Sequence, residues 1–319
     1  WAKLVKEVYD KSLGETYREE DEASKPKQFK EFKAAHLNTG YVLSTIPHGV
    51  DFLTGMVDVQ GSSFETGIWG WSRRREGWLV DRFSMKQRLG LKDINPGDNL
   101  DDWDVLEHIL AMTWPLADGS GRHLRIAKLA VDTGGVPGVT ENARVWASNL
   151  LAAGKCEPWR LMLSKGDAHM KGALYGHVNK IKEDKGGREL PVPVLEGVVN
   201  VSEVKHSMAN PYAVAEPGPN FIHLPKHLHD KYTKELISET LINGLWYKTG
   251  GNNETWDTLV MSEVARALLA PENAGIDWVH DRPVWAVPFI PSSQTDADSD
   301  NQREERDFFS RLSRVNKGP

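Results

Sequence analysis

The chain has 319 residues, of which 39% are hydrophobic and 26% charged, with a formal net charge of −6 at pH 7. This balance is typical of a globular protein with a sizeable buried core, and the single cysteine excludes an intramolecular disulfide. Neither a run of the roughly 20 apolar residues that span a bilayer nor a signal-peptide pattern occurs, so we expect a soluble intracellular protein without membrane association. The negative charge argues against a surface that binds nucleic acid everywhere, but it allows a local basic groove.

The first 46 residues have the pattern of helices that precede a main domain. An amphipathic segment without an initiating methionine opens the chain, a highly charged stretch follows, and a helical pattern resumes from Phe29 to His36. A Pro-His-Gly sequence at 47–49 then interrupts the chain before the first strand. We therefore expect residues 1–46 to be a helical linker or the end of a preceding domain.

Strand patterns then follow one another closely. The short connections between the first three imply an antiparallel meander, and the later alternation with helices predicts a mixed sheet covered on both faces. The expected elements are strands at 53–60, 63–71 and 78–83, a helix at 101–114, a strand at 126–132, a helix at 140–153 and a strand at 159–164. This α/β order is that of the ribonuclease H-like fold. The first and fourth strands would be neighbours there, which would place Asp58 about 5 Å from Asp132.

The second half of the chain is less regular. Residues 166–188 are polar and rich in Gly and Lys, which predicts an exposed loop or insertion. After it we expect β-branched runs at 192–206, a short strand at 220–224, an amphipathic helix at 228–243 and a closing helix at 254–270. Residues 47–272 would form the main domain. Residues 273–319 would be a partly disordered tail, with a partner-docking helix at 306–315.

Three aspartates stand at segment ends. Asp58 and Asp132 each close a short apolar run, whereas Asp257 opens a helical pattern. A carboxylate at the C-terminal end of a strand lies where α/β folds build sites, and three that converge could hold divalent metal ions for phosphodiester cleavage. An Asp can also merely cap the next turn, so the pattern leaves catalysis and a structural role open. Glu254, one turn before Asp257, is an outer metal ligand or a residue favoured by the helix dipole, and we favour the structural role.

Several other polar groups allow two interpretations. His223, His227 and His229 suggest zinc, but Pro225 interrupts helical spacing and no cysteine accompanies them, which favours structural or DNA-facing roles. An expected hairpin tip carries Arg73, Arg74 and Arg75, which are either simply exposed or in contact with a DNA backbone. The basic stretch 180–188 allows the same two interpretations.

An ordered set of motifs resembles a known family. Gly-Met-Val-Asp-Val-Gln at 55–60, followed by a hairpin that ends in Gly-Trp at 70–71, resembles the opening of the nuclease domain in large terminase subunits of lambda-type tailed phages. The resemblance covers roughly residues 47–269. Further segments agree in order, namely 130–135, Lys165-Gly166, 201–205, 219–225, Leu236 with Ser238-Glu239, Trp246 and 253–257.

This resemblance implies a ribonuclease H-like endonuclease that cuts concatemeric viral DNA during genome packaging. Asp58, Asp132 and Asp257 would bind two Mg²⁺ or Mn²⁺ ions, one to activate a water and one to stabilise the leaving 3′ oxygen. Lys165 and Lys205 match positions where the family tends to carry lysine, so each would neutralise phosphate charge or simply be exposed.

The resemblance also implies partners and a place of action. These are double-stranded DNA, the portal protein, the small terminase subunit and an ATPase domain of the same polypeptide, in a packaging motor of the host cytoplasm that is absent from the mature virion. No Gly-x-x-x-x-Gly-Lys-Ser/Thr phosphate loop occurs in the chain, so we expect it to cleave DNA but not to translocate it. The alternatives are another ribonuclease H-like nuclease, such as a resolvase or hybrid cutter, and a mainly non-catalytic portal-docking module.

Overall fold

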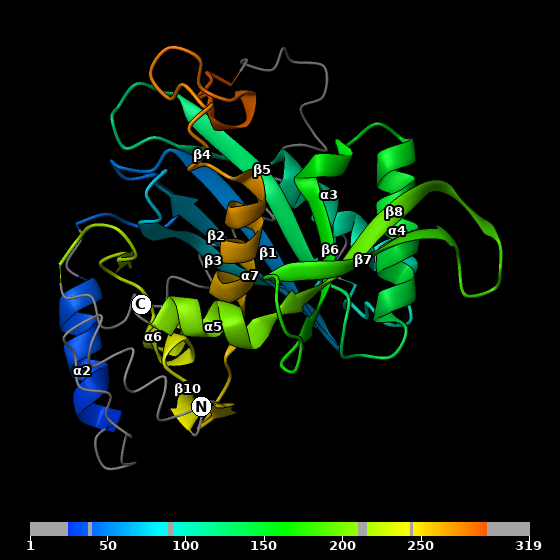
Figure 1. The fold of residues 1–319 in the computed structure, drawn as a ribbon, viewed down its shortest axis with the longest axis horizontal. Coiled ribbons are helices and arrows are strands. Elements are labelled where there is room, and N and C mark those ends of the chain that lie inside the picture. The colour runs from blue at the N-terminus through cyan, green and yellow to red at the C-terminus, as the bar shows by residue number, and fades with distance from the viewer. Residues whose placement is uncertain (1–24, 38–39, 89–91, 210–215, 243–244, 292–319) are drawn as a thin grey trace.

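A large mixed sheet organises the protein. The computed structural model describes residues 25–37, 40–88, 92–209, 216–242 and 245–291 (Figure 1). Within this part, the nine-stranded sheet has the order β7-β8-β6-β5-β1-β2-β3-β9, with the short β4 paired to β5. Its strands are β1 Phe52–Gln60, β2 Ser63–Trp71, β3 Gly77–Met85, β4 Thr113–Pro115, β5 His123–Asp132, β6 Leu161–Asp167, β7 Tyr175–Glu183, β8 Glu189–Asn200 and β9 Ile222–His223.

Helices cover both faces of this sheet, so the predicted mixed α/β architecture is confirmed (Figure 1). On one face α7 packs over β1, β2 and β5, with α5 and α6 beside it, while α3 and α4 cover the other. A separate two-stranded hairpin consists of β10 Glu239–Ile242 and β11 Leu245–Lys248. The helices are α2 Lys25–His36, α3 Val105–Ala111, α4 Val139–Ala152, α5 Val201–Ala209, α6 Asp230–Leu236 and α7 Glu254–Leu269, with 3₁₀ turns η2 Leu100–Asp104, η3 Pro158–Arg160 and η5 Val284–Ala286.

The predicted meander and the predicted neighbours are confirmed. Strands β1, β2 and β3 pair antiparallel in sequence, and β5 lies parallel to β1. Each buries apolar side chains on both faces of the sheet, together with a few buried polar residues such as Glu65, Asp81 and Arg82. The helix expected around 29–36 is part of α2, which is held to β9 because the Leu224 amide donates to the His36 carbonyl.

Three other predictions were wrong in extent. The helix expected at 101–114 is η2 followed by α3, and the chain then forms β4 because residues 113–115 pair with the start of β5. The helix expected at 228–243 ends at Leu236, since residues 239–242 pair with β11. The exposed loop or insertion expected at 166–188 is exposed, but it contains β7, which pairs with β8. Most of β7 is exposed, so no apolar alternation marked it as a strand.

Close contact between α7 and the sheet depends on one glycine. A Cβ added at Gly67 of β2 would lie 2.4 Å from Thr258 Oγ1 of α7. The hydroxyl of Thr258 in turn accepts a hydrogen bond from the Trp69 indole at 3.3 Å. The absent side chain therefore lets the first turns of α7 lie directly on β2.

The described part of the expected tail packs against the sheet. Trp278 is buried against Phe52 of β1, and η5 contacts β1 and β5. Phe289 exchanges two backbone hydrogen bonds with His123, of 2.7 and 3.0 Å. Residues 292–319, including the expected docking helix, and residues 1–24 lie outside the described residues.

Candidate active site

Two aspartates lie side by side where β1 and β5 end. Val57 pairs with Val131 in the parallel register, so Asp58 and Asp132 occupy the next level of the two strands. Two positions earlier, Met56 and Ala130 pack in the apolar cluster beneath α7. Side chains alternate along a strand, so both aspartates point to the face that α7 covers. Figure 1 shows α7 lying across β1.

The third aspartate comes from that helix. Asp257 lies in the first turn of α7, directly before Thr258, which contacts β2. Burial, and after it the neighbouring charges of Asp257 and Asp132, raise the pKa of Asp58 to about 7, while a hydrogen bond from Gln60 acts in the opposite direction. The mutual repulsion of the three carboxylates follows from their proximity. The structure therefore brings together the three aspartates that the sequence singled out.

Asp257 is held by a lysine and an asparagine. The Lys205 ammonium lies 3.2 Å from Asp257 Oδ1, and Asn253 Nδ2 donates to Asp257 Oδ2 at 2.8 Å. Both groups also hold Glu239, because Lys205 donates to its two oxygens at 2.8 and 2.7 Å and Asn253 donates to Oε1 at 2.7 Å. Partial burial raises the pKa of Asp257 to about 6, with Lys205 lowering it and Glu239 raising it.

Asp132 is fixed by the turn that follows β5. The Gly134 amide donates to Asp132 Oδ1 at 2.8 Å. Burial raises the pKa of Asp132, while this hydrogen bond and the positive charge of Lys165 lower it. Lys165, in β6, therefore acts on the site electrostatically. Its alkyl chain passes near Gly134.

The side chains as they stand do not surround a cation. Among the described residues, no group of three or more His, Cys, Asp or Glu side chains is arranged to hold a metal ion. Lys205 and Asn253 account for this arrangement, because they already engage both carboxylate oxygens of Asp257. The donor chemistry still fits a hard divalent cation, because carboxylates that repel one another in a partly buried site gain from a shared positive charge.

Glu254 belongs to the edge of this cluster. One of its carboxylate oxygens, Oε2, is buried without a hydrogen-bond partner, and burial raises the pKa of the group. Its charge also raises the pKa of Asp58, although as the last of several causes. Glu254 thus lies near the aspartates, and its role as outer metal ligand stays a prediction.

A buried ionic network fixes the start of α7 beside the aspartates. Arg82 of β3 is fully buried and pairs with Glu65 at 2.9 Å and Glu235 at 3.5 Å. Its Nε donates to the Thr255 hydroxyl at 3.1 Å, and the Thr255 amide donates to Glu235 at 3.1 Å. Glu65 stands directly opposite Asp58 in the β1–β2 ladder. The network therefore connects β2, the strand next to the one that carries Asp58, to the helix that carries Asp257.

Sequence reasoning missed the site roles of Glu239, Asn253 and Glu65. Each lies outside the segment-end pattern that marked the aspartates, because Glu239 starts a short exposed hairpin and Glu65 sits within β2. Two signals were available: Ser238-Glu239 and Asn253 stand among the segments that carry the family resemblance, and Asn253 lies four residues before Asp257 at the N-terminus of α7.

The predicted arginines lie elsewhere. The turn that carries Arg73, Arg74 and Arg75 joins β2 to β3 beside the start of β1, since Trp71 pairs with Phe52. This turn therefore lies at the opposite end of the strands from Asp58. Arg75 is also engaged, with its Nε 2.8 Å from Glu263 of α7. A DNA contact by these arginines stays a prediction, but the structure does not bring them to the carboxylates.

The histidines do not converge. His223 is buried, stacks on Trp78 and lies 2.6 Å from Glu76, whereas the His229 ring accepts a hydrogen bond from the Lys231 amide at the start of α6. His227 is exposed. These positions agree with the structural roles that were favoured over zinc.

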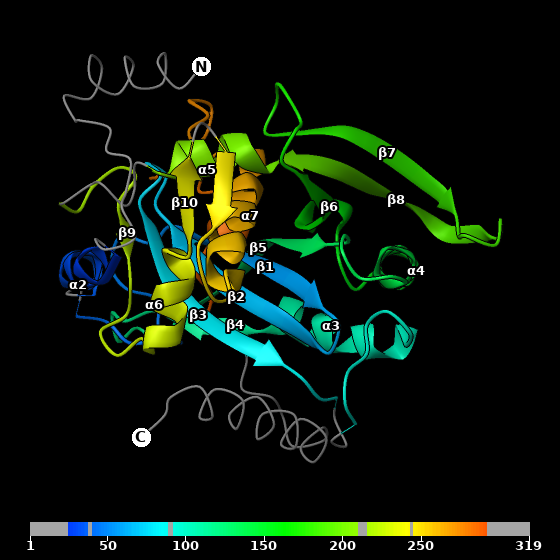
Figure 2. The same cartoon turned by 90° about the horizontal axis from the view of Figure 1, so that it is seen from below.

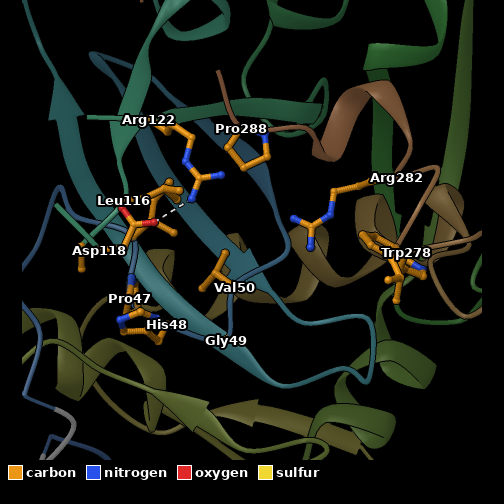
Figure 3. A pocket seen from close by; sticks show the side chains of 13 residues that line it. Pro47, His48, Gly49, Val50, Leu116, Asp118, Arg122, Trp278, Arg282 and Pro288 are labelled. Atoms are coloured by element: carbon orange, nitrogen blue, oxygen red, sulfur yellow. Dashed lines mark hydrogen bonds and ion pairs between the residues drawn. The ribbon is translucent and has the colours of Figure 1, made fainter. Parts of the chain in front are cut away.

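A cavity of about 410 Å³ lies at the opposite end of the strands from the three aspartates. It is lined by residues before β1 and after β4, among them His48 and Leu116, and by Trp278 and Arg282 (Figure 3). Arg122 points toward it but is paired with Asp118 at 2.9 Å. None of the carboxylates of the candidate site lines this cavity, so its polar groups belong to a different region.

Comparison with known proteins points to one family. A family model described as the endonuclease domain of the terminase large subunit gpA matches residues 2–278. The large terminase subunit of Escherichia phage lambda is 29% identical over 91 residues, which are 28% of this chain and 13% of that protein. The chain thus matches only a small share of that relative's length. No solved structure shows a significant match.

Proposed function

The chain belongs to the terminase large subunit endonuclease domain family, and from that premise we propose that it hydrolyses double-stranded viral DNA in concatemers during genome packaging. The observation that carries this proposal is the convergence of Asp58, Asp132 and Asp257 on one face of the sheet, from two neighbouring strands and one helix. We further propose that the fold is of the ribonuclease H-like type, because its order of meander, helix, parallel strand, helix and parallel strand agrees with that class.

The proposed mechanism uses two Mg²⁺ or Mn²⁺ ions held by the three aspartates, with Glu254 as an outer ligand. The chemistry supplied by such ions is activation of a water and stabilisation of the leaving 3′ oxygen. Asp58 and Asp257, with pKa values of about 7 and 6, would be driven to the ionised form by positive charge. Lys205, once released from Asp257, would neutralise phosphate charge, and Lys165 would do so from β6.

Plasmid cleavage tests the proposal. The purified chain is expected to nick or linearise supercoiled plasmid with Mn²⁺ or Mg²⁺ and not with EDTA. Asp58→Asn, Asp132→Asn and Asp257→Asn should each abolish cleavage, because the amide removes the charge and keeps the shape. Asp281→Asn, at an exposed position after α7, is the matched control and should cut like wild type. Cleavage that survives all three single changes would refute the site assignment.

Substrate comparison separates the endonuclease from related enzymes. Linear duplex, a four-way junction and an RNA–DNA hybrid of equal length should be offered to the same preparation. Preference for the junction or the hybrid would identify a resolvase or hybrid cutter instead. Failure to cut any of them, with intact portal binding, would favour the docking module.

Partners and domain division are also proposals. We propose that residues 1–46 connect to an ATPase motor of the same polypeptide, that residues 47–272 cut DNA, and that residues 273–319 dock on the portal protein in the host cytoplasm. The small terminase subunit would supply cut-site choice. Deletion after Pro291 should spare plasmid cleavage and weaken portal binding, and equal loss of both would contradict the division.

In the described residues no helix is long and apolar enough to cross a membrane.

A further inference from the structure

In the part of the chain that the structure describes, most of β7 and Leu195 of β8 are exposed, so the outer part of this hairpin has an open face. On the other face α4 packs against β8, where the Ser148 hydroxyl donates to the Val192 carbonyl and accepts from the Val192 amide, at 2.6 and 3.0 Å. Glu196 pairs there with Arg144 of α4. The hairpin is thus fixed from one side. It extends away from the body past α4 (Figures 1 and 2).

The open face is the one that carries the aspartates. Val199 of β8 packs in the apolar cluster beneath α7, whereas Val194 packs in the cluster against α4. Side chains alternate, so Leu195 shares its face with Val199, and it is 57% exposed. Lys180 stands opposite Leu195 in the antiparallel ladder and therefore lies on the same open face. Lys182, two residues later, is exposed as well.

The register also gives the spacing to the candidate site. Asp132 pairs with Ser164, and Ser164 pairs with Gly197, so these residues form one row across the sheet. Lys180 lies on β7, one strand farther out than Gly197. It pairs with Leu195, so it is displaced from that row by about two residues along the strand direction. With three strand spacings of about 4.8 Å and about 3.3 Å per residue along the strand, its Cα is about 16 Å from that of Asp132. A long lysine side chain at this distance can reach the backbone of a duplex whose scissile phosphate is at the aspartates.

The chemistry of the hairpin favours a duplex backbone over a single strand. Residues 176–189 contain Lys180, Lys182, Lys185 and Arg188 but no Phe, Tyr or Trp on which bases could stack, and Tyr175 at the start of β7 is half-buried with its hydroxyl bonded to the Leu163 carbonyl. Arg188 is paired with Asp184 at 2.7 Å, which leaves the lysines as the available cations of this segment. Lysine ammonium groups bind phosphate without reading sequence.

We propose that the open face of the β7–β8 hairpin, through Lys180 and Lys182, binds the phosphate backbone of duplex DNA that extends from the aspartate cluster. This inference rests on the proposed function. The competing interpretation is that lysines on β7, an edge strand of the sheet in the described residues, merely prevent edge-to-edge association.

Fluorescence anisotropy with a 30-bp duplex in EDTA tests the proposal across a range of salt concentrations. Lys180→Ala/Lys182→Ala should weaken binding roughly tenfold and reduce the slope of log Kd against log salt by about 2, since each phosphate contact that forms on binding releases about one counterion and two such contacts would be lost. Lys180→Arg/Lys182→Arg should bind like wild type. The control is Arg122→Ala/Lys155→Ala, which removes two exposed cations at the opposite edge of the sheet.

Plasmid cleavage in parallel separates this inference from the proposed function. If the double alanine variant needs more DNA for half-maximal rate but cuts at the wild-type rate when saturated, the hairpin binds DNA. If wild type cuts and the double alanine variant binds DNA like the control, the inference about the hairpin is overturned while the proposed function stands. Self-association of that variant would then assign the lysines to edge protection. If wild type binds DNA but cuts none, the proposed function fails while the salt slopes still decide the hairpin's role. A wild-type chain that binds no DNA overturns the inference.

Discussion

Lys205 of α5 and Asp257 of α7 form an ion pair at the candidate active site, with 3.2 Å between Nζ and Oδ1. The same ammonium bonds both oxygens of Glu239. A buried lysine thus supplies positive charge to two carboxylates in the place where a divalent cation is proposed to act. Its release from Asp257 would be part of metal binding, so metal affinity and stability should be linked through this residue.

Lys205→Gln should therefore destabilise the metal-free chain and increase its response to metal. Loss of one partner from a buried pair leaves Asp257 and Glu239 repelling each other, at a cost of about 3 kcal/mol in the free energy of unfolding. Urea unfolding in EDTA measures this cost, and repetition with Mn²⁺ should show a larger stabilisation than in wild type. Lys155→Gln, in an exposed pair with Glu107, is the control. Equal Mn²⁺ stabilisation in all three proteins would show that Lys205 does not compete with the cation.

The stability of the metal-free chain should fall as pH rises from about 5 to 7. The pKa of Asp58 is raised from 3.8 to about 7, so in this window the folded carboxyl keeps a proton that the unfolded chain has already released. Stability from this group is full below pH 4 and is lost as pH approaches 7. Thermal unfolding in EDTA at several pH values should show a weaker dependence in Asp58→Asn. An unchanged profile in that variant would contradict the raised pKa.

Arg82→Met should be strongly destabilising, by about 3–5 kcal/mol, because it removes the buried counter-charge of Glu65 and leaves Glu235 only the exposed Lys231 at 3.6 Å. Denaturant unfolding checks the loss. The triple change Arg82→Met/Glu65→Gln/Glu235→Gln should recover part of it, since the charges that need Arg82 are then absent. A triple variant no more stable than the single one would show that packing around Arg82, and not charge, dominates.

Gly67→Ala should displace α7 and impair cleavage. The added Cβ would lie 2.4 Å from Thr258 Oγ1 and 2.7 Å from its Cβ, neither of which is the end of a long flexible chain. We expect a loss of about 1–3 kcal/mol in stability, as for overpacked cores, and a lower rate on plasmid because Asp257 moves with the helix. Gly61→Ala is the control, since its Cβ would meet nothing within 4 Å. Wild-type activity in Gly67→Ala would show that α7 tolerates the shift.

Local patterns predicted the central strands and marked the three aspartates as candidates, but a shared role for the three came from the family resemblance. Strands β1, β2, β3 and β5 are segments rich in apolar and aromatic residues, with short turns between the first three, and this composition is typical of strands. The topology that follows from these segments placed β1 beside β5, and with it Asp58 beside Asp132. The closing helix and the position of Asp257 in its first turn were also evident from the sequence.

What depends on contacts between distant segments was decided only by the tertiary structure. The hairpin of β7 and β8 escaped prediction because β7 is exposed and carries no apolar alternation, so pairing with β8 alone makes it a strand. Glu239 joined the site through Lys205, 34 residues away in the chain, and Glu65 through the register with Asp58. The arginines at 73–75 lie at the opposite end of the strands from Asp58, because β2 runs antiparallel to β1. A sequence carries the chemistry of each side chain, but the pairing of strands and the packing of α7 determine which of them meet.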